Sequence, residues 1–307
     1  MPPTMSSDYI LVTAAHNEAA NIEATCRSVA SQSALPRRWI VVDDASTDST
    51  HEIVAAYRQM YPELVELVRV TRAPGRDFRN KANAFALGAR RARELGATFI
   101  GNLDADISFE PVYFEKLLER FATDTRLGIG GGLVCSRVDN RFIAQDNAAD
   151  SVAGAVQLFR RECFDAVGAY LPLELGGEDA AAEIMARKIG WNTRTFSDLR
   201  VLEHRRTGTA SSTPLQARRR EGTRLFSLGY GMEFLLARSV RRLLERPRVL
   251  GSLATLWGYL GAMVKRDPVV LPHDVVAFLR REQRAKLLGL LHWGRGADLR
   301  RSVFRSH

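Results

Sequence analysis

Apolar segments of strand length alternate with segments of helical periodicity over the first third of this chain. Buried strands are expected at four apolar runs, Tyr9–Ala14, Trp39–Val42, Leu64–Val70 and Thr98–Leu103. Between them, apolar residues recur at helical spacing in Asn21–Gln32, in the segment containing Ile53, Tyr57 and Met60, and in Lys81–Leu95. Strands that alternate with helices predict an α/β fold, with a mostly parallel sheet and helices on both of its faces.

The regular alternation ends after the apolar segment Leu127–Val134. Beyond it, shorter patterns predict a strand, two helices and a further strand, at Ala153–Arg160, Arg161–Val167, Glu178–Ile189 and Trp191–Phe196. From Leu215 onward the pattern is helical and basic. The sequence therefore predicts an α/β domain over residues 1–205 and a basic helical extension over residues 206–307.

The composition is that of a folded protein with a substantial core, because 46% of the 307 residues are hydrophobic. Cys26, Cys135 and Cys163 are widely spaced and form no CxxC pair, which argues against a disulfide framework and a structural zinc site. The N-terminal segment has no basic region, and the apolar stretch after it is too short for a signal peptide or a membrane span. We therefore expect a cytoplasmic protein.

Charge is distributed unevenly along the chain. Residues 1–199 carry a net charge of −5, whereas residues 200–307 carry 22 Lys and Arg against 8 Asp and Glu, a net charge of +14. The two parts are therefore expected to meet different partners. We expect no nucleic acid among them, because the basic residues are not interleaved with aromatic ones and belong to no known nucleic-acid-binding module.

Polar residues follow each of the four expected strands: His16-Asn17-Glu18, Asp43–Asp48, Arg72–Lys81 and Asp104-Ala105-Asp106. In parallel sheets ligands bind at the carboxyl ends of the strands, so we expect these clusters to meet at one edge. Asp104 and Asp106 are separated by one residue, which places both carboxylates on one side of the strand end. Such a pair suits Mg²⁺ or Mn²⁺, which keeps other positions for water and for the phosphates of a nucleotide-diphosphate donor.

With these motifs the chain resembles the inverting family 2 glycosyltransferases, whose GT-A fold is a Rossmann-like sheet with helices on both faces. The matching stretches are Thr13–Glu18, Val41–Thr50, Leu103–Asp106, Phe159–Arg161 and Gly176–Asp179. They cover about residues 9–205 in the family's order, and Asp43–Asp48 is the most specific of them. No GxGxxG follows the first strand and no P-loop motif occurs, which argues against a dehydrogenase and a P-loop enzyme.

The resemblance implies that residues 1–106 bind the nucleotide sugar. Asp43 and Asp44 are then at the nucleoside, where carboxylates accept hydrogen bonds from the base and the ribose; the alternative is that they cap a helix starting near Thr47. Glu18 then holds the nucleoside end or orders its loop; the alternative is that it acts electrostatically on the first turn of the next helix.

Two basic residues, Arg79 and Lys81, lie where the family often has a cation for the base or the diphosphate. A cation there offsets the charge of the leaving nucleotide diphosphate. A solvated loop charge is the alternative for either residue.

The resemblance also assigns a metal site and a general base. Asp104 and Asp106 hold the divalent metal and the donor phosphates, and His204 completes the metal site or touches the diphosphate, unless it is an ordinary surface histidine. Residues 107–205 form the acceptor half, in which Asp179 takes the proton of the acceptor hydroxyl, with Glu178 beside it raising its basicity. A helix N-terminal cap is the alternative for this pair.

The basic extension contains a sixteen-residue apolar segment, Val249–Val264, flanked by Arg246, Arg248, Lys265 and Arg266. It is too short to span a bilayer, and its aromatic residues and basic flanks favour a helix that lies on an anionic membrane surface. The alternative is a helical subdomain packed on the catalytic core or on a second subunit, as in a homodimer. The first interpretation places the protein at the inner face of the plasma membrane.

Together these features predict a metal-dependent inverting glycosyltransferase that moves one sugar to a hydroxyl of a glycan or a lipid-linked glycan in polysaccharide biosynthesis. The processive members of the family carry Gln-x-x-Arg-Trp and membrane spans, and neither is found here. One rival is a sugar-phosphate nucleotidyltransferase, which should have a glycine-rich phosphate loop after the first strand. The other is a non-catalytic scaffold at a membrane.

Overall fold

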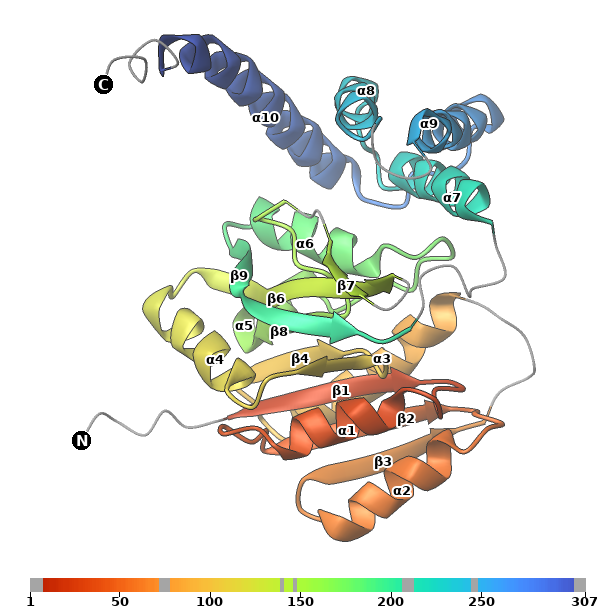
Figure 1. Ribbon diagram of the computed structural model, residues 1–307, viewed down its shortest axis with the longest axis vertical. Coiled ribbons are helices and arrows are strands. Elements are labelled where there is room, and N and C mark those ends of the chain that lie inside the picture. The colour runs from red at the N-terminus through yellow and green to blue at the C-terminus, as the bar shows by residue number, and fades with distance from the viewer. Residues whose placement is uncertain are drawn as a thin grey trace. The chain divides into compact units, whose positions relative to one another are not determined.

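The computed structural model describes residues 8–71, 78–138, 141–145, 148–205, 213–243 and 248–300, with the backbone alone at residue 78 and at residues 290–300. The chain divides into two compact units, Met1–Ala210 and Ser211–His307, and each is described by itself (Figure 1). In the described residues, all strands belong to the first unit, and the second unit is helical.

The first unit is built on one sheet of strand order β3-β2-β1-β4-β8-β6-β9-β5, with β7 attached to β6. Its strands are β1 (Tyr9–Ala15), β2 (Arg38–Asp44), β3 (Val65–Val70), β4 (Phe99–Leu103), β5 (Ile107–Phe109), β6 (Leu127–Val138), β7 (Arg141–Ala144), β8 (Val156–Arg160) and β9 (Asn192–Glu203). Its helices are α1 (Ile22–Ala30), α2 (Thr50–Met60), α3 (Phe78–Glu94), α4 (Tyr113–Thr123), α5 (Arg161–Val167) and α6 (Glu178–Lys188).

The sheet has a parallel part and a mixed part. Strands β3, β2, β1 and β4 are parallel, which brings the loops after β1, β2 and β4 to the same edge. Strand β8 is antiparallel to both β4 and β6, and β6 and β9 are parallel to each other. The expected α/β class is thus confirmed, with the parallel arrangement strongest in the first half of the unit.

Both faces of the sheet are covered by helices, because the central strands are apolar on both sides. Tyr9 and Leu11 of β1 belong to one buried cluster, which takes in residues of α1, α2 and α4. Ile10 and Val12, which alternate with them, belong to a second cluster with residues of α3, α5 and α6. This alternation is the reason that a continuous apolar run can form a doubly covered strand.

The second unit consists of α7 (Pro214–Ser227), α8 (Met232–Arg241), α9 (Arg248–Lys265) and α10 (His273–Arg300). Helices α7 and α9 approach closely at two glycines: a Cβ added to Gly222 would lie 1.9 Å from the carbonyl oxygen of Thr255, and one added to Gly258 would lie 1.9 Å from that of Arg219. A small buried cluster formed by Leu225, Leu235 and Tyr259 packs α7, α8 and α9 together. None of the described helices combines the length and the apolar content needed to cross a bilayer.

Candidate active site

The loops after β1 and β2 are fastened to each other by hydrogen bonds. The side-chain oxygen of Asn17 accepts from the backbone N–H of Thr47 at 2.8 Å, and the backbone N–H of Glu18 donates to Thr50 Oγ1 at 2.7 Å. Asn17 and Ala45 both have φ of 55°, a left-handed conformation that is uncommon outside glycine. These hydrogen bonds join the two loops into one surface at the edge of the sheet.

Asp43 is the buried anchor of the second loop, with a side chain that is 1% exposed. Its Oδ1 accepts from the backbone N–H of Ser46 at 3.0 Å, and its Oδ2 lies 3.0 Å from His51 Nδ1 and 3.6 Å from Arg69 Nε. Asp44 next to it is also buried. Asp43 is therefore held in place by contacts within the chain.

The alternative that Asp43 and Asp44 cap a helix near Thr47 is wrong, because α2 begins at Thr50 and its N-cap is Ser49. Asp48 instead accepts from the backbone N–H of Thr50 at 3.0 Å. The two aspartates lie upstream of the helix and do not cap its first turn.

Asp104 and Asp106 follow β4, and each is paired with a cation of this chain. Lys81 Nζ lies 2.7 Å from Asp104 Oδ1, and Arg205 Nε donates to Asp106 Oδ2 at 2.9 Å. The same Arg205 guanidinium contacts the Glu18 carboxylate. Burial, together with repulsion by Asp104 and Glu203, raises the pKa of Asp106 to about 7. The carboxylates are thus crowded enough to repel one another, and the two cations partly relieve that repulsion.

The backbone of His204 lies beside Asp106, but its side chain points to other residues. Its backbone N–H donates to the Asp106 carbonyl at 2.8 Å, whereas its Nε2 lies 2.7 Å from Ser108 Oγ and its ring meets the edge of Phe142 at 5.6 Å. Over the described residues, no group of three His, Cys, Asp or Glu side chains is arranged to hold a metal ion. The structure therefore does not bring His204 together with Asp104 and Asp106 as a three-ligand set.

Two carboxylates nevertheless fit a hard divalent cation in their chemistry. Mg²⁺ and Mn²⁺ take oxygen ligands and are often held by one or two carboxylates, with water and phosphate oxygens in the other positions. Asp104 and Asp106 supply such oxygens, and their mutual repulsion is the kind that a cation removes. Arg205 and Lys81 contact these same carboxylates.

Glu178 and Asp179 are the first residues of helix α6. Two glycines precede them, in a backbone conformation that only glycine adopts without strain. Gly176 and Gly177 have φ of 71° and 95°, so the chain turns through left-handed conformations just before the acidic pair. The space beside Asp179 is narrow, since a Cβ added to Gly154 would lie 2.6 Å from Asp179 Oδ2. Burial and the neighbouring Asp179 charge raise the pKa of Glu178 above its ordinary value.

Lys81 connects the acidic pair of α6 with the carboxylates after β4. Burial around its ammonium group opposes the charge, but the carboxylates of Asp104, and then of Glu178 and Asp179, outweigh this and raise its pKa above the usual value. Arg79 pairs with a different carboxylate, since its Nη1 lies 3.1 Å from Glu174 Oε1. Residues 72–77 of the expected third loop lie outside the described residues.

Two residues of the site were not expected from the sequence. Arg205 directly follows His204, and nothing in its local pattern indicates that it bridges Glu18 and Asp106. Glu183 lies one turn after Asp179 on the buried side of α6; its Oε1 accepts from the backbone N–H of Val152 at 2.5 Å and from Gln157 Nε2 at 3.1 Å. An acidic residue in an otherwise Ala-rich helix was the available signal for Glu183.

Comparison with known sequences gives a family match over the sheet region. Residues 10–172, more than half of the chain, match the family described as glycosyl transferase family 2. A curated relative, the succinoglycan biosynthesis protein ExoO of Rhizobium meliloti (strain 1021), is 32% identical over 121 residues. This match covers 39% of this chain and 32% of the relative, so it spans about a third of the length of that protein.

Solved structures share the fold at low sequence identity. The mannosyltransferase PcManGT from Pyrobaculum calidifontis, in complex with GDP-Man and Mn²⁺, has a TM-score of 0.57 at 18% identity, over 92% of this chain and 80% of that one. S. aureus TarS 1–349, in complex with UDP-GlcNAc, has a TM-score of 0.51 at 17% identity, over 84% and 72%. GalNAc-T7, with UDP, GalNAc and Mn²⁺, has a TM-score of 0.53 at 15% identity, over 82% and 54%.

Proposed function

This chain belongs to glycosyl transferase family 2, and from that premise we propose that it transfers a single sugar, with inversion, from a nucleotide-diphosphate sugar to an acceptor hydroxyl. The chain is a glycosyltransferase with the GT-A fold.

One observation carries the proposal more than any other: Lys81 joins the two acidic sets of the site. It pairs with Asp104 at 2.7 Å, and the carboxylates of Glu178 and Asp179 also raise its pKa. A donor diphosphate near Asp104 and an acceptor hydroxyl near Asp179 would then lie within one site. Lys81 is well placed to offset the negative charge that grows on the leaving nucleotide diphosphate.

Asp179 is the proposed general base. It takes the proton of the acceptor hydroxyl while that oxygen forms a bond to the anomeric carbon, and the bond from this carbon to the diphosphate oxygen breaks on the opposite side. The Asp179 carboxylate lies close to Gly154, where an added Cβ would come within 2.6 Å of its Oδ2, and two glycines in left-handed conformations precede its helix. Fixed positions of the reacting groups are themselves a large part of catalysis.

Asp104 and Asp106 are the residues proposed to hold a divalent metal, Mn²⁺ or Mg²⁺, as the Mn²⁺ complexes of PcManGT and GalNAc-T7 suggest. The metal would supply positive charge to the donor diphosphate. The nucleoside is proposed to bind at the two joined loops, which contain Glu18, Asp43 and Asp44. For His204 we propose a contact to the diphosphate and no place among the metal ligands, because its side chain pairs with Ser108 and forms no three-ligand set with Asp104 and Asp106 among the described residues.

The acceptor is proposed to be a glycan or a lipid-linked glycan of an exopolysaccharide or the cell envelope. The printed role of the relative ExoO in succinoglycan biosynthesis supports this proposal. We place the reaction in the cytoplasm at the inner surface of the plasma membrane, because the second unit exposes an apolar face and carries 19 Lys and Arg against 7 Asp and Glu over residues 211–307. The apolar face would otherwise be covered by a second subunit.

A donor screen that measures release of UDP or GDP tests the reaction. Asp179→Asn should retain nucleotide binding by calorimetry and lose transfer by about 10²–10⁴-fold, the range expected when a general base is removed. Asp198→Asn is the matched control, because Asp198 pairs with Arg120 on the surface. Full transfer by Asp179→Asn would refute the assignment of the base. Release of pyrophosphate from a sugar phosphate and a nucleoside triphosphate would instead identify a nucleotidyltransferase.

A further inference from the structure

A short stretch of irregular backbone, residues 152–155, contacts both the proposed base and the donor side of the site. It directly precedes β8. Gly154 faces Asp179 so closely that an added Cβ would lie 2.6 Å from Asp179 Oδ2 and 3.1 Å from Asp179 Cβ. The Ala155 carbonyl accepts from the backbone N–H of Asp104 at 2.9 Å. This stretch, called the 152–155 segment below, therefore touches the acceptor half of the site at Asp179 and the donor half at Asp104.

A second hydrogen bond fastens the 152–155 segment to the end of β4. Asn102 Nδ2 donates to the Gly154 carbonyl at 2.5 Å, and Asn102 is buried. Asn102 and Asp104 are two residues apart, so both bonds come from the same end of one strand. The position of Gly154 is thus set by the strand that leads to the donor-side carboxylates.

Glu183 fastens the other end of the 152–155 segment to helix α6. It lies one helical turn after Asp179, so the two side chains share a face of the helix. Glu183 Oε1 accepts from the backbone N–H of Val152 at 2.5 Å. Gln157 Nε2 donates to the Val152 carbonyl at 2.9 Å and to Glu183 Oε1 at 3.1 Å. Both polar backbone groups of Val152 are therefore bound by buried side chains, and one of these belongs to the helix that contains Asp179.

An ion pair with Arg187 is a weaker explanation for the buried Glu183. Arg187 Nη1 lies 3.7 Å from Glu183 Oε2, beyond hydrogen-bond distance, and it donates to the Asp150 carbonyl at 3.3 Å. Burial, and then the charge of Asp179, raise the pKa of Glu183 to about 8. Glu183 thus lies close enough to Asp179 for the two acidic groups to affect each other, and its short contacts go to Val152 and Gln157.

We propose that Glu183 is a positioning residue for sugar transfer, which ties the 152–155 segment to α6 and so holds Asp179 in a fixed place relative to Asp104. The acceptor oxygen must attack in line with the bond that breaks, and a displacement of about 1 Å can cost about 10²-fold in rate. Glu183 is 3% exposed and acts through the segment, without touching either substrate. The inference rests on the proposed role of Asp179 as the general base.

The experiment compares Glu183→Met with Glu183→Gln in the full chain. Methionine keeps the length of the side chain and removes the acceptor for the Val152 N–H, whereas glutamine keeps an acceptor oxygen. The kcat of transfer is measured by release of UDP or GDP with the donor and acceptor found in the donor screen, well below the melting temperature of every variant. Calorimetry with the same nucleotide diphosphate measures binding to the donor half.

The expected result is a loss of kcat without a loss of nucleotide binding. Glu183→Met should lower kcat by about 10–10²-fold and change the nucleotide Kd by less than about twofold, while Glu183→Gln should keep kcat within about threefold of wild type. Hydrogen exchange of peptides that cover residues 152–155 reports on the tie to α6 without any substrate. It should be faster in Glu183→Met and unchanged in Glu183→Gln.

Gly154→Ala tests the same coupling without removing a hydrogen bond, and it serves if Glu183→Met folds poorly. The backbone of Gly154 is not in a left-handed conformation, so alanine can adopt it, but the new methyl group would meet Asp179. This variant should lower kcat at unchanged nucleotide Kd. A wild-type kcat in Gly154→Ala would show that the segment does not position Asp179.

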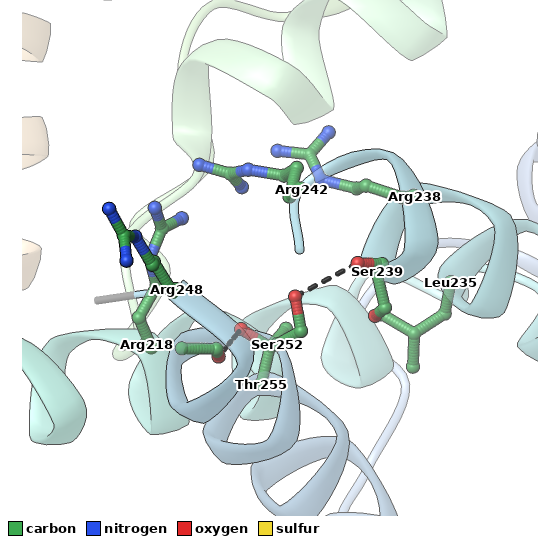
Figure 2. A pocket seen from close by; sticks show the side chains of 9 residues that line it. Arg218, Leu235, Arg238, Ser239, Arg242, Arg248, Ser252 and Thr255 are labelled. Atoms are coloured by element: carbon green, nitrogen blue, oxygen red, sulfur yellow. Dashed lines mark hydrogen bonds between the residues drawn. The ribbon is translucent and has the colours of Figure 1, made fainter. Parts of the chain in front are cut away.

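Two control variants separate this role from a general loss of stability. Gln32→Met makes the matched change elsewhere in the first unit, because the buried Gln32 accepts from the backbone N–H of Phe114 at 3.1 Å and donates to the Glu110 carbonyl at 2.9 Å. Ser252→Ala removes a buried hydrogen bond of the second unit, from Ser252 Oγ to the Ser239 carbonyl at 2.9 Å (Figure 2). Both should lower the melting temperature and leave kcat within about twofold of wild type.

Several outcomes would overturn the positioning role. These are an equal loss of kcat in Gln32→Met, an equal loss in Glu183→Gln, a loss of nucleotide binding that accounts for the loss of kcat, and unchanged hydrogen exchange in Glu183→Met. A wild-type kcat in Glu183→Met, in a protein whose Asp179→Asn variant is inactive, would overturn Glu183 and leave the base assignment intact. Full transfer by Asp179→Asn would overturn both.

Discussion

Replacing the buried Glu183 with glutamine should remove a large pH dependence from the stability of the first unit. The Glu183 side chain is 3% exposed and lies 3.7 Å from Arg187 Nη1. Burial, and then the charge of Asp179, raise the pKa of Glu183 from 4.5 to about 8, against the opposing effect of Arg187. The folded unit therefore holds a proton that the unfolded chain releases above its own pKa.

The sign and size of the effect follow from this difference. Stability from the protonated carboxyl is fully present below pH 4.5 and is lost steadily as the pH rises to about 8. Each pKa unit corresponds to about 1.4 kcal/mol, so the rise from about pH 5 to about pH 8 should cost wild-type protein on the order of 4 kcal/mol. Glutamine does not titrate, and its amide oxygen can still accept from Val152 and Gln157.

The assay is urea unfolding of the full chain, followed by circular dichroism, at several pH values between about 5 and 8. Glu183→Gln should gain stability relative to wild-type protein as the pH rises, and the difference between the two should approach a constant value above pH 8. Glu52→Gln, which changes an exposed glutamate on α2, is the control and should run parallel to wild type. Parallel curves for Glu183→Gln would show that Glu183 keeps an ordinary pKa and would refute the reasoning.

Three further changes test the architecture and the site. Gly258→Ala should destabilise the second unit by about 1–3 kcal/mol, because its Cβ meets a backbone carbonyl, while Gly261→Ala, with open space around it, should be neutral or stabilising in the same thermal melt. Gly177→Ala, at φ of 95°, should cost about 1–2 kcal/mol and lower kcat more than it raises KM, since the start of α6 shifts; unchanged kcat would contradict this. Arg205→Gln should tighten Mn²⁺ binding severalfold in calorimetry because it frees Asp106 and Glu18; weaker binding would count against Asp106 as a metal ligand.

The central strands could be predicted from the sequence because both of their faces are buried. In β1 and β2, every residue from Tyr9 to Val12 and from Trp39 to Val42 packs into one of the two clusters, so the apolar run itself marks the strand. An apolar run does not indicate whether its strand is parallel or antiparallel to its neighbours. The antiparallel insertion of β8 between β4 and β6 depends on pairing between distant segments, and the residue pattern does not indicate it.

The elements that the sequence did not predict are stabilised by their partners. Strand β5 has only three residues and exists because Ile107–Phe109 pair with Val201–Glu203 of β9. All four residues of β7 are exposed, so no apolar alternation marks Arg141–Ala144, and its pairing with β6 defines it. Short or exposed strands of this kind carry no periodic signal that one sequence can reveal.

The site, too, has residues that their type and position could predict and residues that only a distant partner places there. Acidic and amide residues after β1, β2 and β4 could be expected at one edge, because the parallel register of these strands places their ends together. The counter-charges could not be expected. Arg205 reaches Glu18 and Asp106 only because β9 pairs with β5 and brings residues 203–205 beside residues 106–107, a contact across about half of the unit's length.

Those counter-charges bear on whether the site needs a metal. Among the described side chains, Glu18 and Asp104 bring two negative charges to the edge of the sheet, Asp106 brings part of a third because its pKa is raised to about 7, and Lys81 and Arg205 bring two positive charges. A nucleotide diphosphate adds at least two more negative charges, so the site would bind its donor with a clear excess of negative charge if nothing else entered. Repulsion of this kind costs several kcal/mol at short range in a partly buried site. A divalent cation held by Asp104 and Asp106, as proposed above, would offset this charge, as would the guanidinium of Arg205, which contacts Asp106 and Glu18.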